Sequence, residues 1–284
     1  MIPAHNEENV IERCISAILD TARADEFQIV VACNGCSDAT AQVARESFPQ
    51  VTVLESEVAS KTAALNLADS FADIFPRIYL DADLVVPAEA LRALIEPLES
   101  GDALASAGNM QVLHRHSSWL VSSFYKVWSL NPYLDNGKFG GVFAVSKAGH
   151  QRIGSFPAVT NDDELVKRSF SADERATVDS CVFEMRAPQN LAGLLKIRTR
   201  AIRGTLELND ASLNGAGYAA PGAPAEEGAS SFLLIVRRVI FRPRLWLNFV
   251  AYTMISVWVR IKAGISFRRG EKLWERDETS RQAA

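Results

Sequence analysis

RIYLDADLVVP, residues 77–87, joins a short apolar strand to two aspartates. Arg77–Leu80 has the composition of a buried strand, and acids are unfavourable inside such a strand but not at its carboxyl end. That end of an open α/β sheet opens into a ligand crevice. Asp81 and Asp83, one residue apart, can hold a hard divalent cation that keeps its waters and bridges to phosphates. They could equally be turn or helix-cap acids, since Pro87 follows and a helix begins near Ala88.

The segments before this stretch alternate between strand and helix patterns at short spacing. Strands are predicted over Phe27–Cys33 and Val51–Leu54, and the first strand is short because Pro3 follows Met1 and Ile2 directly. Helix patterns cover Glu7–Asp20, with Asn6 as N-cap, Ala39–Phe48 and Lys61–Ala72. Such alternation is typical of a doubly wound α/β fold with a mostly parallel sheet.

Polar segments follow three of the predicted strands. They are Pro3–Glu7, Asn34–Asp38 and Asp81–Asp83. Because the loops after parallel strands gather at one edge of the sheet, we expect the three segments to converge there.

Four ordered motifs carry a resemblance to a known family. They are IPAHNEE (2–8), NGCSDAT (34–40), SKTAALN (60–66) and DAD (81–83). Together they resemble family 2 glycosyltransferases over about residues 1–205. The resemblance implies a GT-A fold, with a Rossmann-like mostly parallel sheet and flanking helices. It also implies a nucleotide-diphospho-sugar donor, transfer with inversion, and Mg²⁺ or Mn²⁺ as cofactor.

The resemblance assigns a nucleotide-binding role to the first loops. Pro3, Ala4 and Glu7 resemble the family's first nucleotide-contacting loop. Asn34 stands where the family often has an aspartate that contacts the base. An amide both donates and accepts, so the base is left open, with uracil, and hence a UDP-sugar, as the expectation. Asp38 is either a nucleotide contact or the N-cap of the helix that follows.

The resemblance also divides the roles of the charged residues near the diphosphate. Asp83 is the expected direct metal ligand. Asp81 is expected nearer the ribose, within the same metal-binding motif. Lys61 is either a partner for the phosphate or base region, or a solvated lysine.

Residues 159–165, VTNDDEL, resemble the family segment that carries the catalytic base. Asp162 then takes the proton of the acceptor hydroxyl, with Asp163 as the second choice. The acids could instead mark only a helix N-terminus, where the dipole favours negative charge. The Gly-rich turn within residues 136–145 resembles the segment lining the donor sugar and acceptor, or is a hairpin turn that needs positive φ.

Charge is distributed unevenly along the 284 residues. The net charge is −4, but residues 230–284 hold 11 Lys and Arg against 4 Asp and Glu, which leaves 19 against 30 in residues 1–229. An acidic body with a basic, apolar tail indicates different partners for the two parts. We expect no nucleic-acid partner.

The cysteine pattern favours a reducing compartment. Cys33 and Cys36 form a C-x-x-C, but no second pair or His cluster completes a zinc site. We expect a cytoplasmic protein, and no signal peptide is recognised at the start of the chain.

The chain divides into three expected parts. Residues 1–206 form the catalytic domain, and residues 207–231, rich in Gly, Pro, Asn and acids, form a linker or flap. Residues 232–284 form a helical tail. Its apolar run Leu245–Val259 is shorter than the roughly 20 residues of a bilayer span. An in-plane or re-entrant helix at the cytoplasmic face of the membrane fits better, with helices packed on the catalytic domain or a second subunit as the alternative.

These features give two hypotheses for function. The first is a metal-assisted inverting glycosyltransferase whose acceptor is a hydroxyl compound, lipid-linked or otherwise presented at the membrane. The alternative is a degenerate member that binds a nucleotide sugar without transferring it.

Overall fold

The computed structural model describes residues 1–132, 134, 137–213 and 229–270. The side chains of residues 211–213 and 229–231 are not described. The chain divides into two compact units. Among the described residues, the first unit holds Met1–Asn109 and Gly137–Phe183, and the second holds those between Met110 and Asn136 and those from Glu184 to Gly270.

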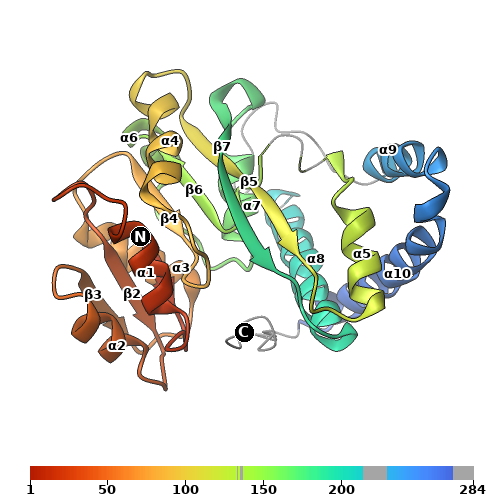
Figure 1. Ribbon diagram of the computed structural model, residues 1–284, viewed down its shortest axis with the longest axis horizontal. Helices are drawn as coiled ribbons and strands as arrows, with labels where there is room; N and C mark the ends of the chain where they lie inside the picture. The colour runs from red at the N-terminus through yellow and green to blue at the C-terminus, as the bar shows by residue number, and fades with distance from the viewer. Residues whose placement is uncertain (133, 135–136, 214–228, 271–284) are drawn as a thin grey trace. The chain divides into compact units, whose positions relative to one another are not determined.

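A parallel sheet opens the first unit. Its order is β1 (Ile2–Ala4), β2 (Val30–Asn34) and β3 (Thr52–Ser56), with both neighbouring pairs parallel. Every residue of β2 is buried, as expected for a central strand covered on both faces. Helices α1 (Ile11–Leu19), α2 (Thr40–Ser47) and α3 (Lys61–Phe71) connect and flank these strands (Figure 1). The α/β class is confirmed.

β4 (Arg77–Leu80) belongs to a second sheet, and two backbone hydrogen bonds join it to the start of β1. The amino group of Met1 donates to Ile78 O at 2.8 Å, and Leu80 N donates to Met1 O at 3.0 Å. This is the bonding pattern of a parallel pair. Pro3 has no N–H, so no further bond of this kind can form there, while pairing with β2 continues to Ala4 opposite Cys33.

The second sheet has the order β4, β6, β5, β7. β6 (Val142–Val145) runs antiparallel to β4 and to β5 (Ala105–Leu113), and β7 (Arg175–Arg186) forms the edge. The remaining helices of the first unit are α4 (Ala88–Glu99), α6 (Lys147–Ile153), α7 (Asp162–Arg168) and the 3₁₀ turn η2 (Ala172–Glu174). Strands β5 and β7 each have residues in both units.

The first helix begins later than its sequence pattern indicates. α1 starts at Ile11 with Val10 at the N-cap position, so the expectation of Asn6 as N-cap is wrong. Asn6 has a φ of +53°, and its side-chain oxygen accepts from Ser37 N at 2.8 Å. Asn is among the few residues that adopt this conformation readily, and its side chain is used between loops rather than at the helix end.

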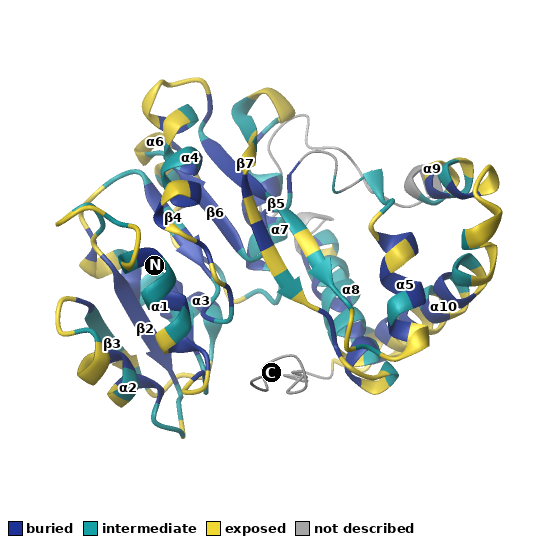
Figure 2. Ribbon diagram, in the orientation of Figure 1, coloured by how far each residue is buried: buried dark blue, intermediate teal, exposed yellow. Residues whose placement is uncertain are grey.

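Helices make up most of the second unit. They are α5 (Trp119–Trp128), α8 (Leu191–Leu213), α9 (Ala229–Ile240), the 3₁₀ turn η3 (Pro243–Leu245) and α10 (Trp246–Arg268). A core of buried side chains joins them, including Phe124, Leu194, Ile235, Tyr252 and Val259. Figure 2 shows these inward sides in dark blue.

The expected linker and tail take the following form. Residues 207–213 lie in α8, residues 214–228 lie outside the described residues, and α9 begins at Ala229. α10 has 23 residues and is longer than the expected apolar run, since the helix continues past Val259 to Arg268. Among the described helices, none has both the length and the apolar character needed to cross a bilayer.

Candidate functional site

The site is built at the carboxyl ends of β1, β2 and β4, all in the first unit. Asn34, the last residue of β2, is buried at 2% exposure. With its amide oriented to suit its neighbours, its nitrogen donates to Ala4 O at 2.8 Å and its oxygen accepts from Ser60 N at 3.2 Å. Asn34 therefore ties the end of β1 to the start of α3. His5 adds a contact, with Nδ1 2.5 Å from the backbone oxygen of Asn34.

The turn after Asn34 depends on Gly35. Its φ is +60°, and a Cβ there would lie 2.9 Å from the Cβ of Ala59. Gly adopts this conformation without strain and leaves room for the close approach of the neighbouring loop.

Asp38 acts at the start of α2. Its Oδ1 accepts from Thr40 N at 3.0 Å and from Thr40 Oγ1 at 2.5 Å, and its Oδ2 accepts from Glu8 N at 3.2 Å. Burial opposes the charge, but these hydrogen bonds, Thr40 first, hold the pKa of Asp38 below its usual value. The N-cap position of α2 is Ala39, without a side-chain cap hydrogen bond, so the predicted N-cap role of Asp38 is wrong. Asp38 stabilises the turn that precedes α2 instead, and a nucleotide contact by Asp38 stays a prediction.

Glu7 links the same loops from the β1 side. Its side chain is buried, and its backbone nitrogen donates to Thr40 Oγ1 at 2.7 Å. Its carbonyl oxygen accepts from Val10 N and Ile11 N, both at 2.9 Å, which starts α1. Pro3 and Ala4 lie in β1, paired with Ala32 and Cys33.

The C-x-x-C borders this loop with both thiols reduced. Cys33 is buried and Cys36 is half-buried. A hydrogen bond from the Cys33 thiol lowers the pKa of Cys36 to about 6. Cys36 Sγ lies 3.4 Å from Ala4 O and accepts from Asn6 N at 3.5 Å. No group of three or more His, Cys, Asp or Glu among the described residues is arranged to hold a metal by itself.

Lys61 bridges two of the predicted site residues. Its Nζ lies 2.8 Å from Asp81 Oδ1 and 3.0 Å from Asp162 Oδ2. Lys61 is the first residue of α3, whose N-cap Ser60 accepts from Ala63 N at 3.3 Å. Burial would lower the pKa of the Lys61 ammonium, but the carboxylates of Asp162 and Asp81 outweigh burial and raise it. Lys61 is therefore not a freely solvated lysine.

Asp162, the first residue of α7, has a side chain only 5% exposed. Burial raises the pKa of its carboxyl, against the opposing effect of Lys61. Oδ2 accepts no hydrogen bond of good geometry from the described residues, and the contact with Lys61 is a charge contact. A buried carboxylate in this state is suited to accept a proton or a ligand.

A second lysine, Lys138, was not singled out by the sequence patterns. Its Nζ lies 2.9 Å from Asp163 Oδ2. Burial would raise the pKa of Asp163, but Lys138 and then Lys61 outweigh burial and lower it. Gly140 makes room for this pair, since a Cβ there would lie 2.5 Å from both charged atoms. A lysine inside a Gly-rich turn was the available signal.

The turn that carries Asp81 and Asp83 follows β4 directly. Asp81 N donates to Gly141 O at 2.8 Å, and Asp81 O accepts from Leu84 N at 3.2 Å. Arg13 Nη2 donates to the backbone oxygen of Asp83 at 3.5 Å. Both aspartates are half-buried, and Asp81 Oδ1 is the atom that contacts Lys61.

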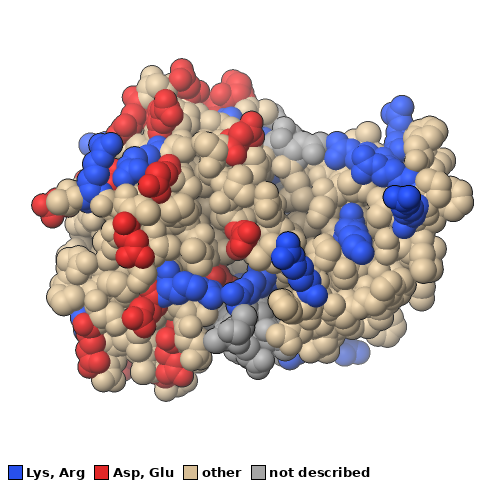
Figure 3. Space-filling model, viewed as in Figure 1, with Lys and Arg blue, Asp and Glu red and all other residues tan. Residues whose placement is uncertain are grey.

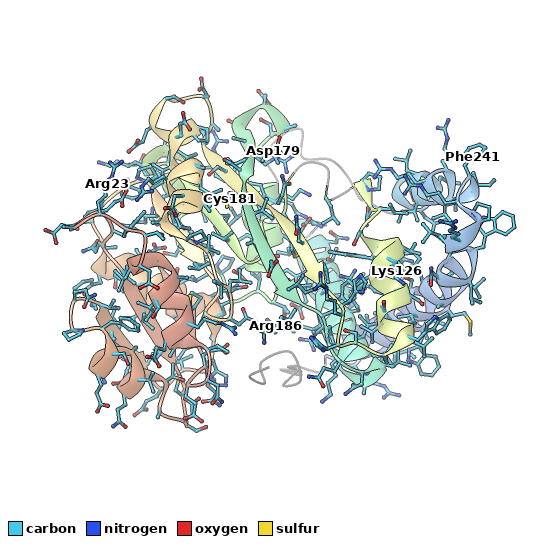
Figure 4. The ribbon with its side chains drawn as sticks, viewed as in Figure 1. Arg23, Lys126, Asp179, Cys181, Arg186 and Phe241 are labelled. Atoms are coloured by element: carbon cyan, nitrogen blue, oxygen red, sulfur yellow. The ribbon has the colours of Figure 1, made fainter. Side chains whose placement is uncertain are left out.

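The predicted site residues thus fall into two groups within the first unit. One group joins the loops after β1 and β2 and contains Pro3, Ala4, Glu7, Asn34 and Asp38. The other joins charged side chains of the turn after β4, of α3 and of α7, and contains Lys61, Asp81 and Asp162. Asp83 lies in the same turn as Asp81, and its side chain has no part in these two ion pairs. Figure 4 draws the side chains around these strand ends.

Comparison with known proteins identifies the family. Residues 1–154 match the model of the glycosyl transferase family 2, which is more than half of the chain. This chain belongs to that family.

Two curated relatives are similar over part of their length. The succinoglycan biosynthesis protein ExoA of Rhizobium meliloti is 30% identical over 193 residues, which are 63% of this chain and 56% of that protein. The glycosyltransferase AglD of Haloferax volcanii is 27% identical over 117 residues, which are 38% of this chain and 19% of that protein. The matched regions thus span less than two thirds of either relative.

Solved structures confirm the GT-A-like fold. A glucosyl-3-phosphoglycerate synthase of Mycobacterium tuberculosis, in complex with Mn²⁺, UDP-glucose and phosphoglyceric acid, has a TM-score of 0.55 at 20% identity. The match covers 72% of this chain and 77% of that one. Another mycobacterial protein has a TM-score of 0.56 at 20% identity, with 72% of both chains covered.

Proposed function

We propose that this protein transfers a sugar from a nucleotide-diphospho-sugar to a hydroxyl acceptor, with inversion and with the help of Mg²⁺ or Mn²⁺. The observation that carries the proposal is the cluster of Lys61, Asp81 and Asp162 at the strand ends of a family 2 chain. Lys61 connects Asp81, which lies on the nucleotide side, with the buried Asp162 of α7. A reaction between a donor and an acceptor requires groups for both substrates in one site.

The nucleotide binds across the loops after β1 and β2 in this proposal. Pro3, Ala4 and Glu7 line its base and ribose side, with Asn34 and Asp38 behind them. The M. tuberculosis synthase was solved with UDP-glucose, which supports a UDP-sugar as the first donor to test. Because both ends of the Asn34 amide are used by Ala4 and Ser60, Asn34 shapes the base pocket more than it selects the base.

The residues after β4 fit a divalent cation. Mg²⁺ and Mn²⁺ at nucleotide sites are held by one or two carboxylates, with phosphates and waters as the other ligands. Asp83 and Asp81 supply two half-buried carboxylates on one turn, so a third protein ligand is not needed. The bound cation supplies charge neutralisation for the departing diphosphate.

Asp162 is the general base. Its carboxylate accepts the proton of the acceptor hydroxyl as that oxygen forms a bond to the anomeric carbon. The bond from this carbon to the diphosphate oxygen breaks on the opposite side, and its electron pair leaves with the diphosphate. One displacement of this kind inverts the configuration. Lys61 holds Asp162 in place, and Lys138 holds the neighbouring Asp163.

The acceptor, in the same proposal, is lipid-linked or otherwise presented at the cytoplasmic face of a membrane. The basic and apolar composition of residues 230–284 supports this part of the proposal. The protein acts there as a peripheral or re-entrant membrane protein.

The test is a transfer assay with the full chain, Mn²⁺ and a panel of nucleotide sugars, with lipid extract and soluble sugars as acceptors. The expected result is release of nucleoside diphosphate that depends on acceptor, and a product of inverted configuration by NMR. Donor binding without release under any acceptor would favour the alternative, a nucleotide-sugar-binding protein without transfer activity.

A further inference from the structure

The outer sides of α9 and α10, and Phe241 directly after α9, expose an unusual amount of large apolar surface. We call this surface the α9–α10 face. It comprises twelve exposed residues: Leu233, Leu234, Ile240, Phe241, Trp246, Leu247, Val250, Met254, Val257, Trp258, Ile261 and Ile265. Phe241, at the end of α9, is 87% exposed and projects away from the helices (Figure 4).

The apolar residues of α10 lie on two separate sides of the helix. One set, which includes Tyr252, Ile255 and Val259, is buried in the core of the second unit. The other set recurs at 246, 250, 254, 257, 261 and 265, which is the spacing of one continuous helical stripe. Trp258 and Leu247 widen that stripe. α10 is therefore apolar on the side that packs and on the side that faces out.

Charge on these helices has one sign. Residues 229–270 contain eight basic residues and no acidic one: Arg237, Arg238, Arg242, Arg244, Arg260, Lys262, Arg268 and Arg269. Figure 3 shows Lys and Arg, without Asp or Glu, on the visible part of this region. Arg242 and Arg244 lie in the turn between the two helices, next to Phe241 and Trp246. An exposed apolar stripe bordered only by cations is complementary to a surface that is apolar inside and anionic outside.

A second copy of the chain is a poorer match. Pairing two such faces would bring exposed basic residues of one copy, such as Arg242, Arg244 and Arg260, toward those of the other, with no acid among residues 229–270. Like charges brought together in this way oppose association. An anionic lipid bilayer meets the same face with opposite charge.

We propose that the α9–α10 face binds the surface of an anionic bilayer, with α10 lying in the plane of the membrane. Trp246 and Trp258 enter the region between headgroups and acyl chains, where their amphipathic rings are favoured. Arg242, Arg244 and Arg260 contact the anionic headgroups. The proposal rests on the proposed function in one respect, because this face would contact the membrane that presents the acceptor. Lipid binding itself requires no catalytic activity.

Vesicle flotation with the full chain tests this proposal without donor or acceptor. The parent should float with vesicles of phosphatidylcholine and phosphatidylglycerol, and much less with phosphatidylcholine alone or in high salt. The double variant M254E/W258E should lose at least about tenfold in membrane partitioning, because two acids then enter the apolar stripe. R244Q/R260Q should weaken binding to anionic vesicles only.

The matched control is V58E/I74E in the first unit. It makes the same change at two apolar residues of similar exposure, 58% and 57%, and it should float like the parent. Circular dichroism and nucleotide-induced thermal shifts should be the same for all variants. A change in flotation alone therefore tests lipid binding independently of the proposed transfer reaction.

Two outcomes would overturn the proposal. One is equal flotation of M254E/W258E and the parent. The other is a parent that ignores anionic vesicles and is dimeric by light scattering, with M254E/W258E monomeric. In that second case the face is an interface between two copies of the chain.

Discussion

The strand-end cluster of the first unit and the α9–α10 face of the second arrange charge in opposite ways. In the cluster, Lys61 lies within 3.0 Å of the carboxylates of Asp81 and Asp162, and Asp162 is withdrawn from solvent. On the α9–α10 face, cations stand beside exposed apolar side chains, with no acid among residues 229–270. Internally compensated charge fixes geometry, as a reaction site needs. Charge of one sign beside exposed apolar surface favours association with a partner.

The largest expected effect concerns the carboxylate that the cluster keeps buried. D162N should lower turnover about 10²-fold or more, since the amide cannot take the acceptor proton. Donor affinity should stay near that of the parent, because the change is isosteric. Steady-state kinetics and nucleotide titration separate the two effects.

The matched control for this change is E164Q, in the same helical turn. Glu164 is paired with Arg168 and has no proposed part in the reaction. If D162N keeps turnover within a few fold of the parent, Asp162 is only a helix-end acid, and Asp163 becomes the residue to test.

Loss of the positive charge of Lys61 should destabilise the first unit. K61M leaves Asp162 buried without its counter-ion, and we expect a loss of about 2 kcal/mol in unfolding free energy, below the usual cost of a fully buried pair because Lys61 is partly exposed. The double variant K61M/D162N should recover most of it. Urea denaturation measures both, and no recovery in the double variant would mean that Lys61 acts through packing.

The hydrogen bonds of Asn34 that connect β1 with α3 should contribute less to stability than Lys61 does. N34A removes two hydrogen bonds of a buried amide, and we expect a loss of about 1–2 kcal/mol by urea denaturation. Q50A, at an exposed position in the same unit, should change stability by much less. An N34A protein as stable as the parent, with weakened nucleotide binding, would instead favour direct base contact.

The smallest effect concerns Cys36. With a pKa of about 6, its thiol is largely ionised at neutral pH. Alkylation of the parent by iodoacetamide should therefore rise with pH to half its maximum near pH 6, and C36S should lose this component. If alkylation shows a single phase with a midpoint above pH 8, then Cys33 does not stabilise the thiolate of Cys36.

Much of the fold could be predicted from local patterns. β4 has the expected bounds, because its apolar positions and the aspartates that follow mark where it ends. The family motifs led to Lys61, Asp81 and Asp162, which the structure brings together. The predicted N-cap role of Asn6 is wrong, since a residue suited to capping is equally suited to a left-handed loop position.

Other features depend on contacts that local patterns do not contain. The antiparallel β6 arises from pairing with β4 and β5, two strands distant in sequence. The Lys138–Asp163 pair joins residues 25 positions apart. The two apolar sides of α10 also required the structure, because the sequence alone shows an apolar helix and not which side is covered.

The most direct test of the central claim is nucleotide binding by the carboxylates after β4. Thermal unfolding of the full chain would be followed with UDP, with and without Mn²⁺, for the parent, D83A and the control D73A, whose acid is exposed outside the site. We expect a Mn²⁺-dependent stabilisation by UDP in the parent and in D73A that is lost in D83A. Equal Mn²⁺-dependent shifts in all three proteins would contradict this expectation.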